Sequence, residues 1–72
     1  MVNINKLKGK IVENGISVEI LAEKIGIDKS TLYRKMSNNG EALTVKEANQ
    51  ICKELRLSVG EATVIFFSDL VA

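Results

Sequence analysis

Aliphatic residues recur along this chain at helical spacing. Ile4, Leu7 and Ile11 stand three and four residues apart, which places them on one face of a helix. Proline is absent, β-branched residues form no long period-2 alternation, and Asn14-Gly15 supplies a first helix stop. The pattern therefore predicts an all-α fold that begins with a helix over residues 4–14.

A helix start signal recurs four times further along the chain. An aliphatic residue is followed directly by a side chain that can accept a hydrogen bond from the free amides of a helix N-terminus. The four dipeptides are Ile16-Ser17, Ile27-Asp28, Leu43-Thr44 and Leu57-Ser58. Thr44 and Glu47 also have the spacing of a capping box, and Ser58 with Glu61 repeats it. We therefore expect further helices over residues 18–25, 29–36, 45–56 and 59–67, followed by a tail, 68–72.

The length and composition predict one small domain over residues 1–72. The chain has 72 residues, of which 46% are hydrophobic and 26% charged, as in an ordinary globular protein. Its longest apolar run, Val64 to Phe67, is far shorter than the roughly 20 residues of a membrane span. The first residues lack the apolar stretch of a secretory signal. We expect a cytoplasmic protein without a membrane partner.

Catalytic chemistry has little support in the sequence. Histidine, the commonest general base and metal ligand, is absent, and Cys52 is a single cysteine. Cys52 falls on the apolar stripe of the predicted 45–56 helix, where a small core residue is expected. We therefore predict no enzyme activity, no catalytic residues, no metal, no cofactor and no small-molecule substrate.

Charge is distributed unevenly along the chain. The net charge is only +1, but residues 1–36 hold seven basic and four acidic side chains, whereas residues 37–72 hold three basic and five acidic ones. A basic half of this kind is typical of a nucleic-acid-binding face, and it is also compatible with lysines scattered on a solvated surface. We expect Lys6, Lys8 and Lys10 to be solvated, and likewise the carboxylates of Glu19 and Glu23.

The second and third predicted helices form a helix-turn-helix pattern. They are separated only by Gly26-Ile27-Asp28, a turn so short that the helices must cross steeply and share one core. Ala22 is small where the third helix crosses the second, and Gly26 can take a positive φ. Leu32 is expected to anchor the third helix inward.

Over residues 17–36 the sequence resembles the Cro/CI family of phage repressors, also called the Xre family. The five-helix layout extends this resemblance over residues 4–67. It implies a five-helix, lambda-repressor-like DNA-binding domain with the helix-turn-helix on the second and third helices, and a double-stranded DNA operator as the partner. Val18 stands where many members have glutamine, and Lys35 stands where relatives often bury an apolar residue. We expect Met36 to take over that anchoring.

The third predicted helix has one side suited to reading DNA. Leu32 and Met36 define its buried side, and Ser30 and Arg34 lie opposite them. Arg34 can donate two hydrogen bonds to guanine O6 and N7 in the major groove. By resemblance, the base-reading positions are Lys29, Ser30, Tyr33 and Arg34. The expected DNA backbone contacts, at the second helix's N-terminus and around the third helix and its following loop, are Ser17, Val18, Thr31, Ser37, Asn38, Asn39 and Gly40.

The last nine residues contain six large apolar side chains. They are Val64, Ile65, Phe66, Phe67, Leu70 and Val71. Adjacent phenylalanines cannot both face the core from one helix, so an apolar patch is left for a partner. We predict a homodimer built on Phe67, Leu70 and Val71, because two-fold dimers on paired half-sites are usual for helix-turn-helix proteins. The alternative is that the tail only covers the monomer core.

Two functions from different classes are compatible with these patterns. The first is a sequence-specific transcriptional regulator, a Cro-like or short phage-type repressor that binds a palindromic operator. The second is a protein-interaction module on the same scaffold, such as an antitoxin or antirepressor partner, with little DNA affinity. Near-neutral charge and Val18 favour the second, whereas Lys29, Arg34 and the basic first half favour the first. The salt dependence of DNA affinity discriminates between them.

Overall fold

The computed structural model describes residues 2–68, and within that range the chain forms five α-helices and no strand. The helices are α1 (Ile4–Glu13), α2 (Val18–Ile25), α3 (Lys29–Ser37), α4 (Val45–Glu54) and α5 (Val59–Phe66). The predicted all-α, five-helix fold is confirmed. The largest difference from the predicted bounds is at α4, which ends two residues early because Leu55 is its C-cap and Arg56 has a positive φ of 53°.

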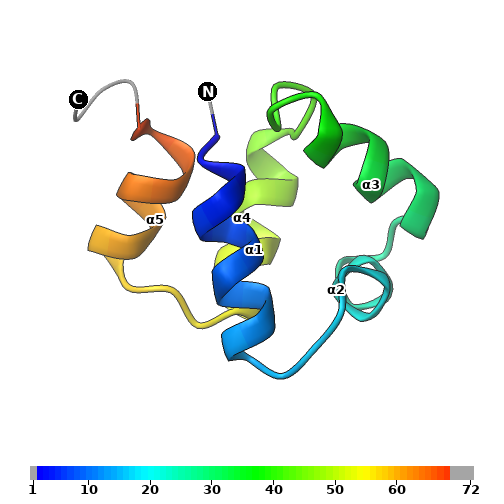
Figure 1. Ribbon diagram of the computed structural model, residues 1–72, viewed down its shortest axis with the longest axis horizontal. Helices are drawn as coiled ribbons and strands as arrows, with labels where there is room; N and C mark the ends of the chain where they lie inside the picture. The colour runs from blue at the N-terminus through cyan, green and yellow to red at the C-terminus, as the bar shows by residue number, and fades with distance from the viewer. Residues whose placement is uncertain (1, 69–72) are drawn as a thin grey trace.

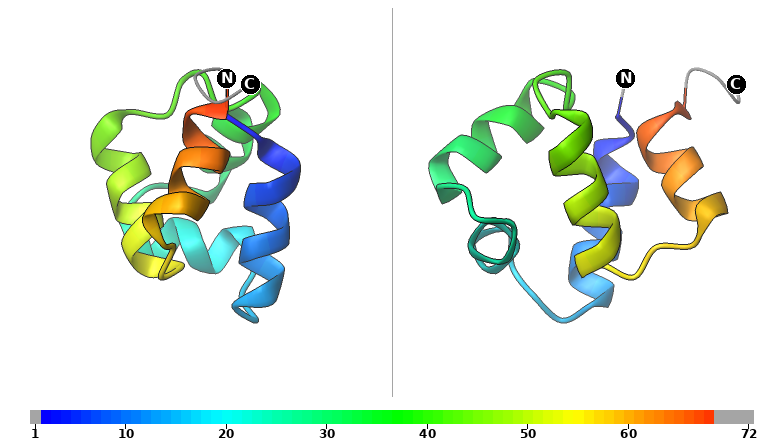
Figure 2. Two further views of the ribbon diagram at one scale, coloured as in Figure 1. Left: turned by 90° about the vertical axis from the view of Figure 1, so that its left-hand side faces the viewer. Right: turned by 180° about the vertical axis from the view of Figure 1, so that it is seen from behind.

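Two helices form the middle of the molecule. α1 and α4 lie between α5 on one side and the pair α2 and α3 on the other (Figure 1). The view from behind keeps this order, now with α4 in front of α1 (Figure 2). α2 is seen end-on where α3 lies across the picture, so these two helices cross steeply (Figure 1). α2 packs against both α3 and α4, and α5 packs against α1.

Every helix contributes to one hydrophobic core. The buried residues are Leu7, Ile11, Leu21, Ala22, Ile25, Leu32, Met36, Ile51, Leu55 and Ile65. Burial of each large aliphatic side chain stabilises the fold by about 1.5–3 kcal/mol. The aliphatic residues of the four start signals are half-buried and pack around this core. No helix of residues 2–68 has both the length and the apolar character needed to cross a membrane.

The predicted helix caps are confirmed by hydrogen bonds. Ser17, Asp28, Thr44 and Ser58 each accept a hydrogen bond from an amide of the helix that follows. Both capping boxes are complete, because the Thr44 and Ser58 amides also donate the reciprocal bonds to the carboxylates of Glu47 and Glu61, at 2.9 Å in each case. Sequence reasoning missed a fifth cap, Asn3, whose side chain accepts a hydrogen bond from the Lys6 amide at 3.1 Å.

Residues 2 and 3 connect the loop after α3 with α5. The Val2 amide donates to the Asn39 carbonyl at 3.2 Å, and the Asn3 amide donates to the Ile65 carbonyl at 2.7 Å. Gly40 lies beneath Val2 with a φ of +71°, and a Cβ atom at position 40 would lie 2.6 Å from the Val2 Cβ. Only glycine fits there, both for its φ and for the space.

Candidate nucleic-acid interface

The turn between α2 and α3 has the geometry that the sequence predicted. Gly26 takes a φ of +78°, in the left-handed region that glycine enters without steric cost. Ala22 and Leu32 are both buried, so α3 crosses α2 closely and is anchored inward. The Asp28 carboxylate accepts a hydrogen bond from the Ser30 amide at 3.1 Å and begins α3. One side of α3 is thereby turned away from the core.

The outer side of α3 is polar and exposed. The four predicted base-reading residues Lys29, Ser30, Tyr33 and Arg34 are all exposed. Leu32 and Met36 fill the inner side, as predicted, and Tyr33 is 46% exposed although it is a large aromatic residue. The structure therefore places all four residues on the exposed part of one helix. Their contact with DNA stays a prediction.

Tyr33 is held by a carboxylate that we expected to be only solvated. The Tyr33 hydroxyl donates a hydrogen bond to Glu19 Oε2 on α2 at 3.0 Å. This bond raises the pKa of Tyr33, while the bond from the Glu19 amide, followed by that from Tyr33, lowers the pKa of Glu19. Because the single hydroxyl proton is engaged, the Tyr33 oxygen faces other partners as an acceptor.

The residues predicted to contact phosphate lie in different environments. Ser17, Ser37, Asn38 and Asn39 are exposed, and Val18 and Thr31 are half-buried. Ser17 already accepts a hydrogen bond from the Ile20 amide at 3.2 Å, and Val18 packs against the core. At the start of α2, the main chain and the Ser17 hydroxyl are therefore the groups that could meet a phosphate.

Gly40 differs from the rest of this predicted set. It is buried, and its amide donates to the Lys35 carbonyl at 3.0 Å. The Asn38 amide likewise donates to the Arg34 carbonyl, at 3.3 Å. We therefore expect Gly40 to shape the loop, and the exposed side chains of Asn38 and Asn39 to be its groups nearest to DNA.

An ion pair that the sequence did not reveal joins α3 to α4. Lys35 Nζ donates hydrogen bonds to both carboxylate oxygens of Glu47, at 2.8 and 2.7 Å. The side chains of Lys35 and Glu47 are only 16% and 13% exposed. Burial acts to raise the pKa of Glu47, but the bonds from Lys35 and from the Thr44 amide outweigh it, and the pKa lies below its ordinary value. Met36 fills the apolar position beside Lys35, as predicted.

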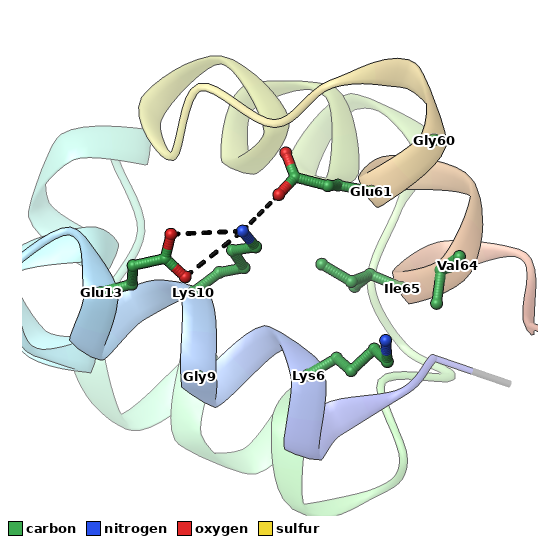
Figure 3. A pocket seen from close by; sticks show the side chains of 8 residues that line it. All are labelled: Lys6, Gly9, Lys10, Glu13, Gly60, Glu61, Val64 and Ile65. Carbon is green, nitrogen blue, oxygen red and sulfur yellow. Dashed lines mark hydrogen bonds and ion pairs between the residues drawn. The ribbon is translucent and has the colours of Figure 1, made fainter.

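A second ion pair joins α1 to α5, away from α3. Lys10 binds Glu61 and also Glu13, the latter at 3.3 Å (Figure 3). Lys10, which we expect from the sequence to be solvated, is half-buried and shared between these two carboxylates. The bonds from Lys10 and then from Ser58 lower the pKa of Glu61 to about 2. These side chains line a pocket whose walls include two glycines, Gly9 and Gly60.

Other chemistry is sparse in the part of the chain that the structure describes. No group of histidine, cysteine, aspartate or glutamate residues in positions 2–68 is arranged to hold a metal ion. Cys52 is half-buried, and burial raises the pKa of its thiol. It is therefore a weakly reactive thiol in a mainly structural position.

The fold and the exposed third helix define a helix-turn-helix DNA-binding domain. Residues 6–66 match the family model of the Cro/C1-type HTH DNA-binding domain. The chain belongs to this family, as its sequence resemblance implied. No curated protein and no solved structure matches it significantly.

Proposed function

We propose that this protein is a sequence-specific transcriptional regulator, a Cro-like or short phage-type repressor, that inserts α3 into the major groove of a palindromic operator. The observation that carries the proposal is the exposed side of α3, where Lys29, Tyr33 and Arg34 project from a helix that is anchored by Leu32. An exposed aromatic and an arginine on a short helix contribute little to packing. The protein would work in the cytoplasm by binding, without catalysis or a cofactor.

The side chains on α3 suggest how bases would be read. Arg34 can donate two parallel hydrogen bonds to guanine. Tyr33, with its proton engaged by Glu19, would accept from the amino group of adenine or cytosine, or contact a thymine methyl group through its ring. Lys29 and Ser30 would reach a base edge or a phosphate in the first turn.

A homodimer would supply the two-fold symmetry of such an operator. Phe67 is 56% exposed and Val45 is 79% exposed. Both line an apolar pocket between α4 and α5, together with Leu43, Ala48 and Phe66. This surface supports Phe67 as part of the dimer interface. Leu70 and Val71, the other residues predicted for it, lie outside the described residues.

The alternative is a protein-interaction module with little DNA affinity. Glu19 favours it, because a carboxylate held beside Tyr33 repels phosphate and binds a basic partner better. Val18 favours it too, since its half-buried side chain cannot bond a phosphate. The basic residues Lys29 and Arg34 on α3 support the regulator instead.

The test is selection of bound sequences from a random duplex pool, followed by titrations of the selected site at two salt concentrations. The regulator should enrich a two-fold symmetric site and lose affinity steeply as salt is added. Arg34→Ala should weaken binding to that site by about 1–3 kcal/mol and relax preference at one base position.

Lys53→Ala is the matched control for this substitution, since Lys53 is an exposed cation in the last turn of α4. It should leave base preference unchanged. Enrichment of no sequence by a folded protein would favour the interaction module. Survival of full selectivity in Arg34→Ala would show that Arg34 reads no base.

A further inference from the structure

The ion pair between Lys35 and Glu47 lies next to the base-reading residues but faces α4. We propose that Lys35 and Glu47 are positioning residues, which set the orientation in which α3 is presented to DNA and so contribute to sequence selectivity. This inference rests on the proposed function, because it assigns a role within base recognition to residues that touch no base.

The geometry of the pair is suited to fixing a helix. One ammonium group bonds both oxygens of one carboxylate, and both side chains are mostly shielded from water. Charge-assisted bonds are stronger where solvent is excluded. Glu47 is itself fixed, because the same carboxylate accepts the Thr44 amide in the capping box of α4 at 2.9 Å. Lys35 is therefore attached to a rigid point.

The attachment to α4 adds to the packing of α3 on α2. α2 is the helix with the most extensive packing on α3, and packing mainly along one neighbour leaves α3 freer to rotate or tilt over it. A second anchor on a different helix restrains that movement. Recognition side chains lose selectivity when their helix is displaced by fractions of an ångström or by about 10–20°.

Lys35 also supports the loop that follows α3. Its carbonyl accepts the Gly40 amide at 3.0 Å, and Gly40 is packed beneath Val2. The residue that binds Glu47 through its side chain thus holds the loop of Asn38 and Asn39 through its main chain. The same residue connects the groups proposed to read bases with those proposed to contact phosphate.

The two capping boxes provide a matched pair of variants. Glu47→Gln and Glu61→Gln each remove one negative charge, and each keeps an oxygen that can accept the capping amide. Glu47→Gln removes the ion pair to α3 and leaves at most one neutral hydrogen bond from Lys35, whereas Glu61→Gln removes the ion pair between α5 and α1. General electrostatics predicts that both variants bind DNA more tightly. The proposed positioning role predicts that Glu47→Gln loses sequence selectivity and that Glu61→Gln does not.

Selectivity is measured as the ratio of the Kd for random duplex to the Kd for the selected site. Glu47→Gln should lower this ratio by about three- to tenfold, and Glu61→Gln should leave it unchanged. Lys35→Arg, which can still bond a carboxylate through two donors, should keep it. Amide hydrogen exchange over residues 32–36 provides a readout that needs no DNA, and it should be faster in Glu47→Gln than in Glu61→Gln.

Equal selectivity and equal exchange in the two glutamine variants would overturn the positioning role. A wild-type protein that selects no site would overturn the regulator proposal instead. In that case the exchange rates still decide whether the pair fixes α3: faster exchange confined to Glu47→Gln supports it, and equal rates contradict it.

Discussion

Two junctions in this molecule are built from the same local device. At the start of α4 and again at the start of α5, the glutamate of a capping box binds the cap of its own helix and a lysine of another helix. Glu47 thereby joins α4 to α3, and Glu61 joins α5 to α1. Each carboxylate both begins a helix and connects two helices.

The surroundings of the two junctions differ. Lys35 and Glu47 are 16% and 13% exposed, whereas Lys10 and Glu61 are 24% and 38% exposed. Lys10 is moreover shared with Glu13, beside a pocket that the absence of side chains at Gly9 and Gly60 leaves open (Figure 3). Water screens such a pair and lowers its contribution to stability. The same motif therefore gives a firm connection at α3 and a weaker one at α1.

Substitution of the lysine should produce the largest difference in stability between the two junctions. Lys35→Met leaves the shielded Glu47 carboxylate without its cation, and the expected loss is about 1–2 kcal/mol, between the values for exposed and buried pairs. Lys10→Met should lower stability by less, because water can solvate Glu61. Urea unfolding measures both losses, and a larger loss for Lys10→Met would reverse the comparison.

Removing each cap hydroxyl should have similar effects at the two junctions. Thr44→Ala and Ser58→Ala should each lower stability by about 1 kcal/mol, since each removes the acceptor of one helix amide. Thermal unfolding of the two variants under one set of conditions measures this. A clearly larger loss for Thr44→Ala would show that the cap of α4 and the bond to Lys35 act cooperatively.

Acid should also weaken both junctions, and its effect should be smaller than those of the lysine and cap substitutions. The folded pKa values of Glu47 and Glu61 lie below the ordinary 4.5, and that of Glu61 is about 2. Their contribution to stability is therefore complete above about pH 5 and is lost as the pH falls toward 2. The unfolding temperature should fall over this range, and fall less in Glu61→Gln. An unchanged acid dependence in that variant would contradict the assignment.

The helices of this fold could be predicted because their signals are local. A cap such as Thr44 and its glutamate lie three residues apart, and the stripe of core residues on each helix follows from helical spacing alone. The inward side of α3, with Leu32 and Met36, was predicted on the same basis. The end of α4 does not follow from such a local signal, because the stop at Leu55 depends on the positive φ of Arg56 and not on a glycine.

The connections between helices could not be predicted in this way. The partners of Glu47 and Glu61 come from helices elsewhere in the chain, and nothing in the spacing of Lys35 or Lys10 distinguishes them from solvated lysines. The bond from Tyr33 to Glu19 was missed for the same reason. The exposed residues of α3 could be named from the sequence, but what restrains them depends on tertiary packing.

The contacts of Val2 and Asn3 have a consequence for the order of folding. They join the chain's beginning to the loop at Asn39 and to Ile65 near the end of α5, so they close large loops at a high cost in chain entropy. The helix-turn-helix contacts are local and should form earlier. During refolding, α2 and α3 should therefore pack against each other before Val2 and Asn3 join the loop of α3 to α5. We expect full competence to dock on DNA to arise only after this last step.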